Sequence, residues 1–510
     1  MQKPIFAIFT GFVAGIALSS SGCLDISHRN TAEHCRWSDG DDVCKDRYGD
    51  DRPFCARAAC DASGEGHYGC VTERPSDDCY YPCGRDQTFL DDASCVPGDG
   101  DGDGDGDGDG DGDGDGDTPC MGPEGCPDAD APFCDLDSGE CVSCDATAEP
   151  DTSCADRQPN TPVCLDQSCV QCAEGKIDAC SGTTPICDLG ASMCVGCSDH
   201  GQCPNSACNF ADGSCIDPAN IMHVDGDADC DTEDGREATP YCTIGNALLA
   251  VDNGAMIVLH EMTTDPLIYN ESRTISSALT IFAADGEIPV VRGIGGNPPF
   301  TVTALGSLTL NGIALSGTQE NAAGLFVSGG NAWVEKSKIL NNAGGGIVVD
   351  GGGMLVLENS FVGGGNVANQ SAIVVADGTL EMAYTTVGAG FGASSALSCV
   401  DNQSVTVRNS LLVSASDDDE LQCDSADVTT SALEMAKGDN IALGDMDAGW
   451  FPPMGFDNGD FHLSLEVDAY PEAIGSAAVW QTGDPSTDMD GDPRPMTDGS
   501  PDFAGADVIP

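Results

Sequence analysis

The sequence predicts a mainly β protein whose C-terminal part is a solenoid, preceded by small disulfide-rich repeats and a disordered Gly-Asp linker. Between positions 300 and 412, short segments of alternating apolar residues recur at a nearly constant interval. A fixed period in the range of roughly 20–50 residues is typical of a solenoid, in which stacked turns bury a continuous core. The recurring segments are rich in aliphatic and β-branched residues, which indicates strands. Upstream, regularly spaced cysteines indicate the disulfide-rich repeats.

One column of side chains is expected to run through the interior of the solenoid. Alternation along each strand places every second residue on the same face. Stacked turns then bring equivalent residues about 4.8 Å apart. The anchors of this inward column recur at nearly equal spacing and are Leu310, Val334, Leu357, Met382 and Val407. A second recurring column is formed by Phe326, Val348 and Val374.

Charge and cysteine content limit the classes of function. The 510 residues contain 19 basic and 85 acidic side chains, a formal net charge of -66. Such a field repels nucleic acid, so we expect no nucleic-acid partner. There are 29 cysteines, only seven histidines and no paired zinc-binding spacing. Disulfides formed in an oxidising compartment are therefore expected.

The N-terminus indicates the compartment. Residues 1–22 combine Lys3 with an apolar run from Ile5 to Leu18, which predicts a secretory signal peptide too short to span a membrane. The run ends in Ser20-Ser21-Gly22-Cys23, which resembles a bacterial lipoprotein box with Ser20 in place of the usual Leu. The resemblance implies that Cys23 carries the lipid anchor. Leu24 after it implies the outer membrane of a Gram-negative bacterium, and hence the cell surface.

Cysteine spacing divides the next part of the chain. Residues 23–97 form a predicted Cys-rich domain, and residues 98–118 a disordered acidic linker of alternating Gly and Asp. Residues 119–217 hold four units of four cysteines, each too small to build a core without bridges. Four cysteines allow three pairings, and the sequence does not choose among them. The units are Cys120–Cys141, Cys144–Cys169, Cys172–Cys194 and Cys197–Cys215. A related earlier set is Cys35, Cys44, Cys55 and Cys60.

Two phrases that flank the repeats carry a family resemblance. The run from Asp225 to Asp231, then Pro240-Tyr241-Cys242-Thr243-Ile244 and a short apolar helix near Leu248 and Leu249, resembles the start of a right-handed parallel β-helix of the pectin-lyase-like superfamily. The closing phrases Asp488-Met489-Asp490-Gly491-Asp492-Pro493-Arg494-Pro495 and Pro501-Asp502-Phe503-Ala504-Gly505-Ala506-Asp507 are similar to the ends of such secreted proteins. The resemblance implies a β-helix with an N-terminal cap over residues 222–440 and an irregular tail or cap over 441–510.

Two disulfides are expected in this C-terminal part. The spacing between Cys399 and Cys423 equals one turn of the solenoid, so these cysteines should stack within bridging distance. Cys230 and Cys242 should close the loop ahead of the cap. Asn359 and Asn409 occupy equivalent turn positions, where a left-handed backbone suits asparagine.

The pectin-lyase-like superfamily includes polysaccharide lyases and hydrolases, so the resemblance raises the question of catalytic residues. Arg408 lies on a predicted strand, but its neighbours one and two turns earlier are Ala383 and Glu358. These neighbours do not form a cluster of acidic residues that could bind calcium. No histidine occurs between His260 and His462. One carboxylate pair remains: Glu335 and Glu358 should face outward on adjacent turns, about 5 Å apart, as in retaining glycosidases. The structural alternative for this pair is a solvated face.

The sequence therefore favours a non-catalytic lipoprotein of the cell surface that serves in display, adhesion or glycan contact. The alternative is a polysaccharide lyase or hydrolase; a second alternative is a calcium-dependent structural protein of the envelope. No cofactor is expected, except that Asp225, Asp227, Asp229 and Asp231 are candidates for binding one calcium ion. Expected partners are the membrane, through the lipid, and a glycan or cell-surface molecule.

Overall fold

The computed structural model describes residues 140–509 apart from 252, 365–366, 393, 401–402, 417–418, 439 and 467. It also describes shorter stretches at 41–49, 52–56, 70–72, 74–75, 80, 87–89, 95–97, 126, 131–135 and 138. The predicted signal peptide, the lipid-anchor Cys23 and the Gly-Asp linker lie outside these residues. The chain divides into two compact units, Met1–Asp115 and Gly116–Pro510.

The first unit is built around a short helix and small hairpins. In its core the disulfide Cys44–Cys70 packs with Cys55, and all three residues are fully buried. Cys55 lies opposite Cys70 in the hairpin, whereas Cys35 and Cys60 of the earlier cysteine set lie outside the described residues. Its elements are α1 (Asp41–Tyr48), β1 (Phe54–Cys55), β2 (Cys70–Val71), β3 (Gln87–Phe89) and β4 (Cys95–Pro97).

The four Cys-rich units share one disulfide pattern. In each, the third and fourth cysteines lie opposite each other in a two-stranded antiparallel hairpin. The second to fourth units join the first cysteine to the third and the second to the fourth, which selects one of the three possible pairings. In the first unit Cys126 pairs with Cys141, as this pattern requires. Among the described cysteines, no bridge joins one unit to the next.

Helical turns and hairpins alternate along these units. Their elements are β5 (Phe133–Asp135), β6 (Glu140–Val142), η7 (Cys144–Ala146), α2 (Pro150–Arg157), β7 (Val163–Leu165), β8 (Ser168–Val170), η8 (Ile177–Ala179), β9 (Ile186–Asp188), β10 (Met193–Val195), η9 (His200–Gln202), β11 (Cys208–Asn209), β12 (Ser214–Cys215) and η10 (Pro218–Asn220).

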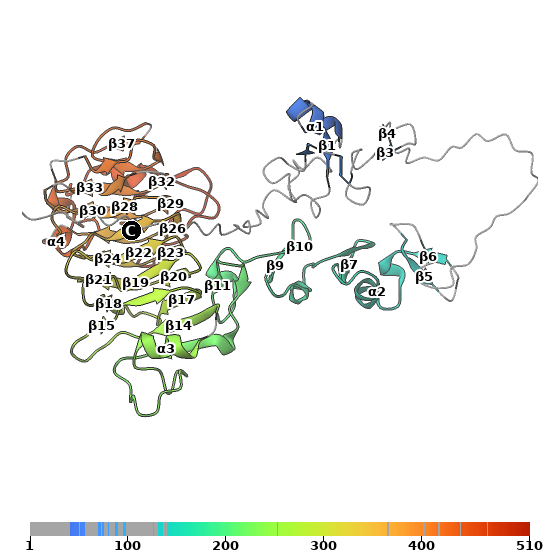
Figure 1. Cartoon of the computed structure of the whole chain (residues 1–510), viewed down its shortest axis with the longest axis horizontal. Coiled ribbons are helices and arrows are strands. Elements are labelled where there is room, and N and C mark those ends of the chain that lie inside the picture. The colour runs from blue at the N-terminus through green and yellow to red at the C-terminus, as the bar shows by residue number, and fades with distance from the viewer. Residues whose placement is uncertain are drawn as a thin grey trace, which may run out of the picture. The chain divides into compact units, whose positions relative to one another are not determined.

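The following segment coils into a parallel β-helix with three sheets, in which neighbouring strands of each sheet come from successive turns (Figure 1). The nine-stranded first sheet comprises β13 (Ile221–Val224), β14 (Ala255–Leu259), β17 (Ala278–Ala283), β20 (Ser307–Asn311), β23 (Asn331–Glu335), β26 (Gly353–Glu358), β29 (Gly378–Ala383), β32 (Gln403–Arg408) and β35 (Asp427–Thr429).

The nine-stranded second sheet comprises β15 (Tyr269–Asn270), β18 (Val290–Arg292), β21 (Ala314–Ser316), β24 (Lys338–Leu340), β27 (Phe361–Gly363), β30 (Thr386–Ala389), β33 (Leu411–Ser414), β36 (Ala432–Leu433) and β37 (Ile441–Ala442). The seven-stranded third sheet comprises β16 (Arg273–Ile275), β19 (Phe300–Thr303), β22 (Leu325–Ser328), β25 (Ile347–Asp350), β28 (Ile373–Val375), β31 (Leu397–Cys399) and β34 (Leu421–Gln422). The solenoid is thus longer than the repeated segments of the sequence indicated. Its early turns are irregular in length, since Met222, Ile257, Ile281 and Leu310 pair in succession at intervals of 35, 24 and 29 residues.

The predicted inward column is confirmed residue by residue. Strand register pairs Leu310 with Val334, Val334 with Leu357, Leu357 with Met382 and Met382 with Val407. All five side chains are buried in one continuous apolar core. Burying one such side chain contributes about 1.5–3 kcal/mol, so the column is a main source of stability. The second column is also in register but faces outward, because its neighbours point inward.

A column of hydroxyl groups lies just inside the turn between the first and second sheets. Each hydroxyl donates to the carbonyl two residues earlier, as Ser337 does to Glu335. Four of the five also accept an amide from the preceding turn. The members of this fully buried column are Ser337, Ser360, Thr385, Ser410 and Ser431. They satisfy backbone groups that the tight turn leaves without a strand partner.

The N-terminal end of the coil is covered by α3 (Ile244–Ala250), as expected. Ile244 and Ala247 are buried in the apolar core, and Leu248 packs against it. Leu249, which we expected to close the end together with Leu248, is 89% exposed instead. The helical period places residues three and four apart on one face, which leaves Leu249 on the opposite side.

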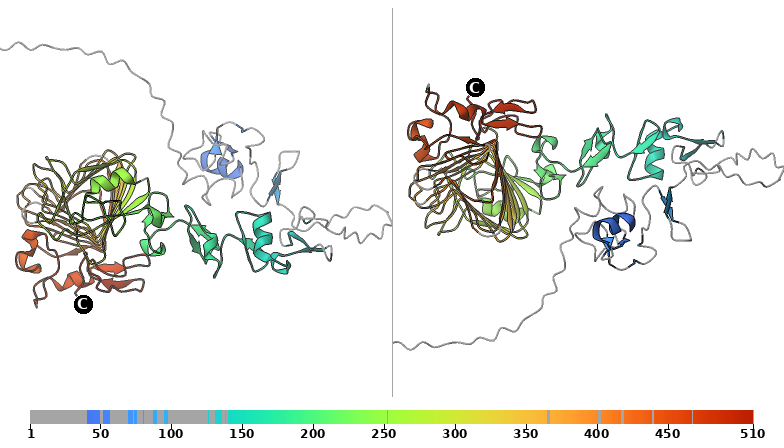
Figure 2. Two further views of the ribbon diagram at one scale, coloured as in Figure 1. Left: turned by 90° about the horizontal axis from the view of Figure 1, so that it is seen from below. Right: turned by 90° about the horizontal axis from the view of Figure 1, so that it is seen from above.

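The tail after the last turn lies along the side of the coil, over the second sheet (Figure 2). Trp450, Phe451, Phe456 and Phe461 form an aromatic cluster against Phe361 of β27. It is therefore a lateral cover with a core of its own. Its elements are η11 (Ala448–Trp450), α4 (Gly455–Asn458), η12 (Glu472–Ser476), β38 (Ala478–Trp480) and β39 (Ser500–Asp502).

The two closing sequence segments, which begin at Asp488 and Pro501, stabilise this cover. Asp488, fully buried, accepts hydrogen bonds from the amides of Asp490, Asp492 and Val508. Arg494 is also buried; it pairs with Asp502 at 3.2 Å and lies 4.2 Å from the centre of the Tyr384 ring. These contacts give a structural role to the Asp-x-Asp-Gly-Asp-Pro-Arg segment near the C-terminus.

Candidate functional site

Glu335 and Glu358 lie side by side on the outer face of the first sheet. Strand register pairs them directly across β23 and β26. The same column continues to Ala383 and Arg408, as the sequence predicted. Both carboxyl groups face outward from the coil, yet both residues are only partly exposed.

Burial changes the ionisation of this pair. Removal from water raises the pKa of Glu335 to about 7, although Asn311 Nδ2 donates to its Oε2 at 3.0 Å. Burial, with the charges of Glu335 and Asp484 added, raises the pKa of Glu358 to about 7 as well. Two neighbouring carboxyls that titrate near neutrality could exchange a proton, which is the chemical capacity of this pair.

The fourth Cys-rich unit supplies the cover. His200 of η9 lies between the rings of Phe210 and Phe282, with centroids 4.6 Å away on each side. Its Nδ1 accepts the amide of Cys208 at 3.1 Å, so a neutral His200 carries its proton on Nε2. That Nε2 is 3.5 Å from Glu335 Oε2. Burial lowers the pKa of His200 to about 4, which keeps the ring neutral.

Other side chains on the outer face of the first sheet are also covered by the fourth Cys-rich unit. Trp333 of β23, a residue type that often stacks on sugars, packs against Phe210 of the fourth Cys-rich unit with ring centroids 5.7 Å apart. Ala207 and Ile216 of the same region are buried against Met256 of β14. This part of the first sheet is therefore an internal interface.

Arg408 is committed to the C-terminal cover. Its guanidinium forms two hydrogen bonds with the carboxylate of Asp484, one of them at 2.8 Å and the other through Nη2. Asp484 is buried and the pair is reinforced by the neighbouring Asn409. An arginine held in this way is a structural cation and not a free base.

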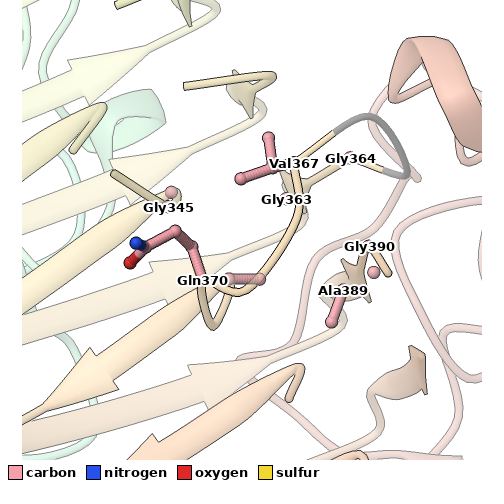
Figure 3. Close-up of a pocket in the computed structure, with 10 residues that line it drawn as sticks. Gly345, Gly363, Gly364, Val367, Gln370, Ala389 and Gly390 are labelled. Carbon is pink, nitrogen blue, oxygen red and sulfur yellow. The ribbon is translucent and has the colours of Figure 1, made fainter. Parts of the chain in front are cut away.

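Three hollows of the surface lie away from these residues. One pocket of about 520 Å³ lies beside the Cys399–Cys423 bridge and is lined by Asp419 and Asp424. Another, of about 290 Å³, lies in the C-terminal cover around Tyr470. A third lies among glycine-rich turns near Gly345, Gly363 and Gln370 (Figure 3) and measures about 10 Å³, room for one water at most.

The four aspartates proposed for calcium are not gathered into a ligand set. Asp227 accepts hydrogen bonds from the amides and hydroxyls of Thr263 and Thr264, which use both of its oxygens. Asp225 and Asp229 each accept the amide two residues later. Among the described residues, the groups whose ligand atoms all lie within 4.8 Å of one another do not include these aspartates. The run is thus a loop held by its own hydrogen bonds, and calcium binding by these aspartates stays a prediction.

Both expected disulfides of the C-terminal part are present. Cys230 pairs with Cys242, with Cα atoms 5.7 Å apart. Cys399 pairs with Cys423 across one turn of the coil, with Cα atoms 4.8 Å apart. The described part of the chain contains no helix with the length and apolar character needed to cross a membrane.

Two histidines that the sequence did not single out lie among carboxylates. His200 meets Glu335 from a different region of the chain, outside the repeats, which themselves contain no histidine between His260 and His462. His462 lies beside Asp460, Asp490 and Asp507. The phrase Asp460-Phe461-His462 places an acid two residues before the histidine, which was the available signal.

Comparison with known proteins adds little on activity. A family model described as "Family of unknown function (DUF8331)" matches residues 107–221, less than half of the chain. No curated protein matches. A solved structure described as "Crystal structure of pectate lyase Pel9A" is similar at 12% identity and a TM-score of 0.25, over 56% of this chain and 95% of that one. We draw nothing from this similarity, and the β-helix is assigned from the strand pairing alone.

Proposed function

We propose that the protein is a secreted lipoprotein, anchored through Cys23 to the outer membrane of a Gram-negative bacterium. There the β-helix would be displayed at the cell surface for adhesion or glycan contact, without catalysis. The observation that carries this proposal is the occupation of the candidate site by the protein itself. Glu335 lies under His200, Trp333 under Phe210, and Arg408 is paired with Asp484.

The disulfide-rich units support an extracytoplasmic location. Each of the second to fourth units has two bridges and little apolar core, so it depends on an oxidising compartment to stay folded. With a formal charge of -66, the surface would bind a neutral glycan or a partner with basic groups in preference to an acidic polymer.

Location is tested by the mass of the mature N-terminus. The protein would be isolated from its native membrane fraction and its N-terminal peptide analysed by mass spectrometry. We expect the chain to begin at Cys23 with added acyl mass, and Cys23→Ala to release the protein from the membrane fraction. An unmodified N-terminus, or an unchanged membrane fraction in Cys23→Ala, would overturn the anchored topology.

The rival function is a polysaccharide lyase or hydrolase, which the two raised carboxyl pKa values favour. The full mature chain would be incubated with acidic and neutral polysaccharides, with and without calcium, and chain length measured. We expect no depolymerisation, and retention of a subset of neutral glycans on an immobilised array. Depolymerisation that is lost in both Glu335→Gln and Glu358→Gln, but kept in Glu381→Gln on the next strand, would establish the enzyme.

A further inference from the structure

The C-terminal cover contains an imidazole surrounded by carboxylates, separate from the candidate site on the first sheet. His462 Nε2 lies 2.6 Å from Asp490 Oδ2, and its Nδ1 faces Asp460 Oδ1. Ligand atoms of His462, Asp490 and Asp507 all lie within 4.8 Å of one another. The three segments that bring these groups together are far apart along the cover.

Both ring nitrogens therefore face carboxylate oxygens. A neutral imidazole has one N–H and one lone pair, so one nitrogen would direct its lone pair at a negatively charged oxygen. That arrangement is unfavourable unless a second proton is shared between the two atoms, or a metal ion replaces their direct contact, which at 2.6 Å leaves no room for an ion between them. The geometry thus favours positive charge within this cluster, at one of the two ring nitrogens.

The balance of charge around His462 distinguishes a bound metal ion from a second proton. A protonated His462 would face the carboxylates of Asp460, Asp490 and Asp507 with a single positive charge, in a site where Asp507 is only 7% exposed. Lys338 of β24 is the nearby basic group, and its charge acts on Asp490. A divalent ion neutralises one more carboxylate than a proton does, and its need for several ligands suits three converging donors.

The surroundings resemble a supported metal ligand. Histidines that bind metals usually donate their other ring N–H to a carboxylate, which fixes the tautomer. Asp460 provides that contact at Nδ1, and Phe361 of β27 holds the ring edge-on at a centroid distance of 4.9 Å. Asp507 is also held, because its Oδ2 accepts the amide of Leu463 at 2.7 Å. Asp488 is already used by three backbone amides.

We propose that His462, Asp490 and Asp507 bind a divalent transition-metal ion of the zinc or manganese class, with Asp460 as the positioning residue. One imidazole and two carboxylates form a mixed nitrogen and oxygen set, which suits zinc or manganese better than calcium. The bound ion joins three segments of the C-terminal cover, and so fixes the cover beside β27. The proposal is independent of the proposed surface function.

The test uses the full mature chain, treated with a chelator, then given Zn²⁺, Mn²⁺ or Ca²⁺ singly at physiological ionic strength. Bound metal is measured after gel filtration, together with the melting temperature. We expect the wild type to retain one more equivalent of zinc or manganese than His462→Lys and Asp507→Asn, and to melt higher with it. Asp445→Asn, an exposed acid of the same cover, should behave as the wild type. Calcium should not compete.

His462→Lys separates the two cations, because lysine supplies the positive charge without an imidazole ligand. Asp460→Asn should weaken zinc binding roughly 10- to 100-fold without abolishing it. Co²⁺ added to the wild type gives a readout independent of any variant, as visible absorption bands of a bound ion. Equal metal binding in wild type and His462→Lys, or no cobalt bands, would overturn the proposal and leave a protonated histidine.

Discussion

The Cys-rich units and the β-helix compensate for the entropy of chain ordering in different ways. The second to fourth units have a hairpin and two bridges each, and the buried residues of their small clusters are mainly the cysteines themselves. The β-helix instead buries long aliphatic columns, and its described residues include only the bridges Cys230–Cys242 and Cys399–Cys423. A disulfide should therefore be essential in the first region and secondary in the second, although the chemical bond is the same.

The sharpest test removes one bridge from each region. Cys180 and Cys194 close a sequence separation of 14, whereas Cys399 and Cys423 close one of 24. Loop entropy alone would make the longer closure more stabilising. We expect the opposite: Cys180→Ser with Cys194→Ser should unfold its unit completely, and Cys399→Ser with Cys423→Ser should leave the coil folded. Limited proteolysis with mass spectrometry would show this, and protection of residues 172–194 in the first variant would contradict it.

The reverse comparison truncates a core residue of the coil. Leu357→Ala removes a fully buried side chain from the inward column and should cost about 2–5 kcal/mol in the free energy of unfolding. Val356→Ala, on the outer face of the same strand, is the matched control and should cost under about 1 kcal/mol. Chemical denaturation monitored by circular dichroism gives both values. Equal losses would show that the column is not the main source of stability.

A substitution in the turn between the first and second sheets is expected to have a smaller effect on stability. Asn409 is buried in a left-handed conformation, φ 54°, and bonds both the amide and the carbonyl of Val479. Asn409→Ala should cost about 1–3 kcal/mol, because the side-chain hydrogen bonds with Val479, Asp484 and Thr430 are lost and the backbone is strained. Asn409→Gly relieves the strain alone and should recover only part of the loss, as thermal melting would show. Full recovery in the glycine variant would mean that the hydrogen bonds to the cover contribute nothing.

The interface between the fourth Cys-rich unit and the β-helix predicts that stability depends on pH, which is the smallest of the expected effects. Glu335 and Glu358 have ordinary pKa values of 4.5, raised to about 7 in the folded protein. A raised carboxyl pKa means that the folded state prefers the protonated form, so this contribution is present below pH 4.5 and is lost as pH rises to 7. His200, whose pKa is lowered to about 4, acts in the opposite direction over a similar range.

Replacing both carboxyls should therefore increase stability at high pH. Glu335→Gln with Glu358→Gln is expected to raise the free energy of unfolding at pH 8 by about 1 kcal/mol, after allowance for solvent screening, and to change little at pH 4. Melting temperatures across this range, compared with Glu381→Gln, give the measurement. A variant that is less stable than the wild type at pH 8 would show that the charged pair is favourable.

Much of the fold could be predicted from spacing because a solenoid repeats its own environment. Leu310, Val334 and Leu357 recur at nearly constant intervals since each occupies the same position on successive turns. The first turn has no such signal, because β13 and β14 are separated by a loop and the helix α3 rather than by a turn of constant length. The lateral position of the cover also has no local signal, since its aromatic residues reveal burial but not the partner sheet.

The candidate site was predicted only in part for a related reason. The pairing of Glu335 with Glu358 follows from the period, and it is correct. His200 comes from another region, and its contact with Glu335 depends on how a Cys-rich unit packs against the coil. Ionisation could not be foreseen either, because burial that raises both carboxyl pKa values arises from that packing. The spacing of residues along the sequence predicts which residues are neighbours on adjacent turns of the coil. It does not predict which residues of another region pack against them.

The bridges of the second to fourth Cys-rich units all close within a unit, and this has a consequence for how the protein can change over evolutionary time. Duplication or deletion of one whole unit leaves every remaining cysteine with its partner. The array can therefore gain or lose length without mispairing. The number of units is free to vary, because oxidative folding of each one is independent of how many others precede it.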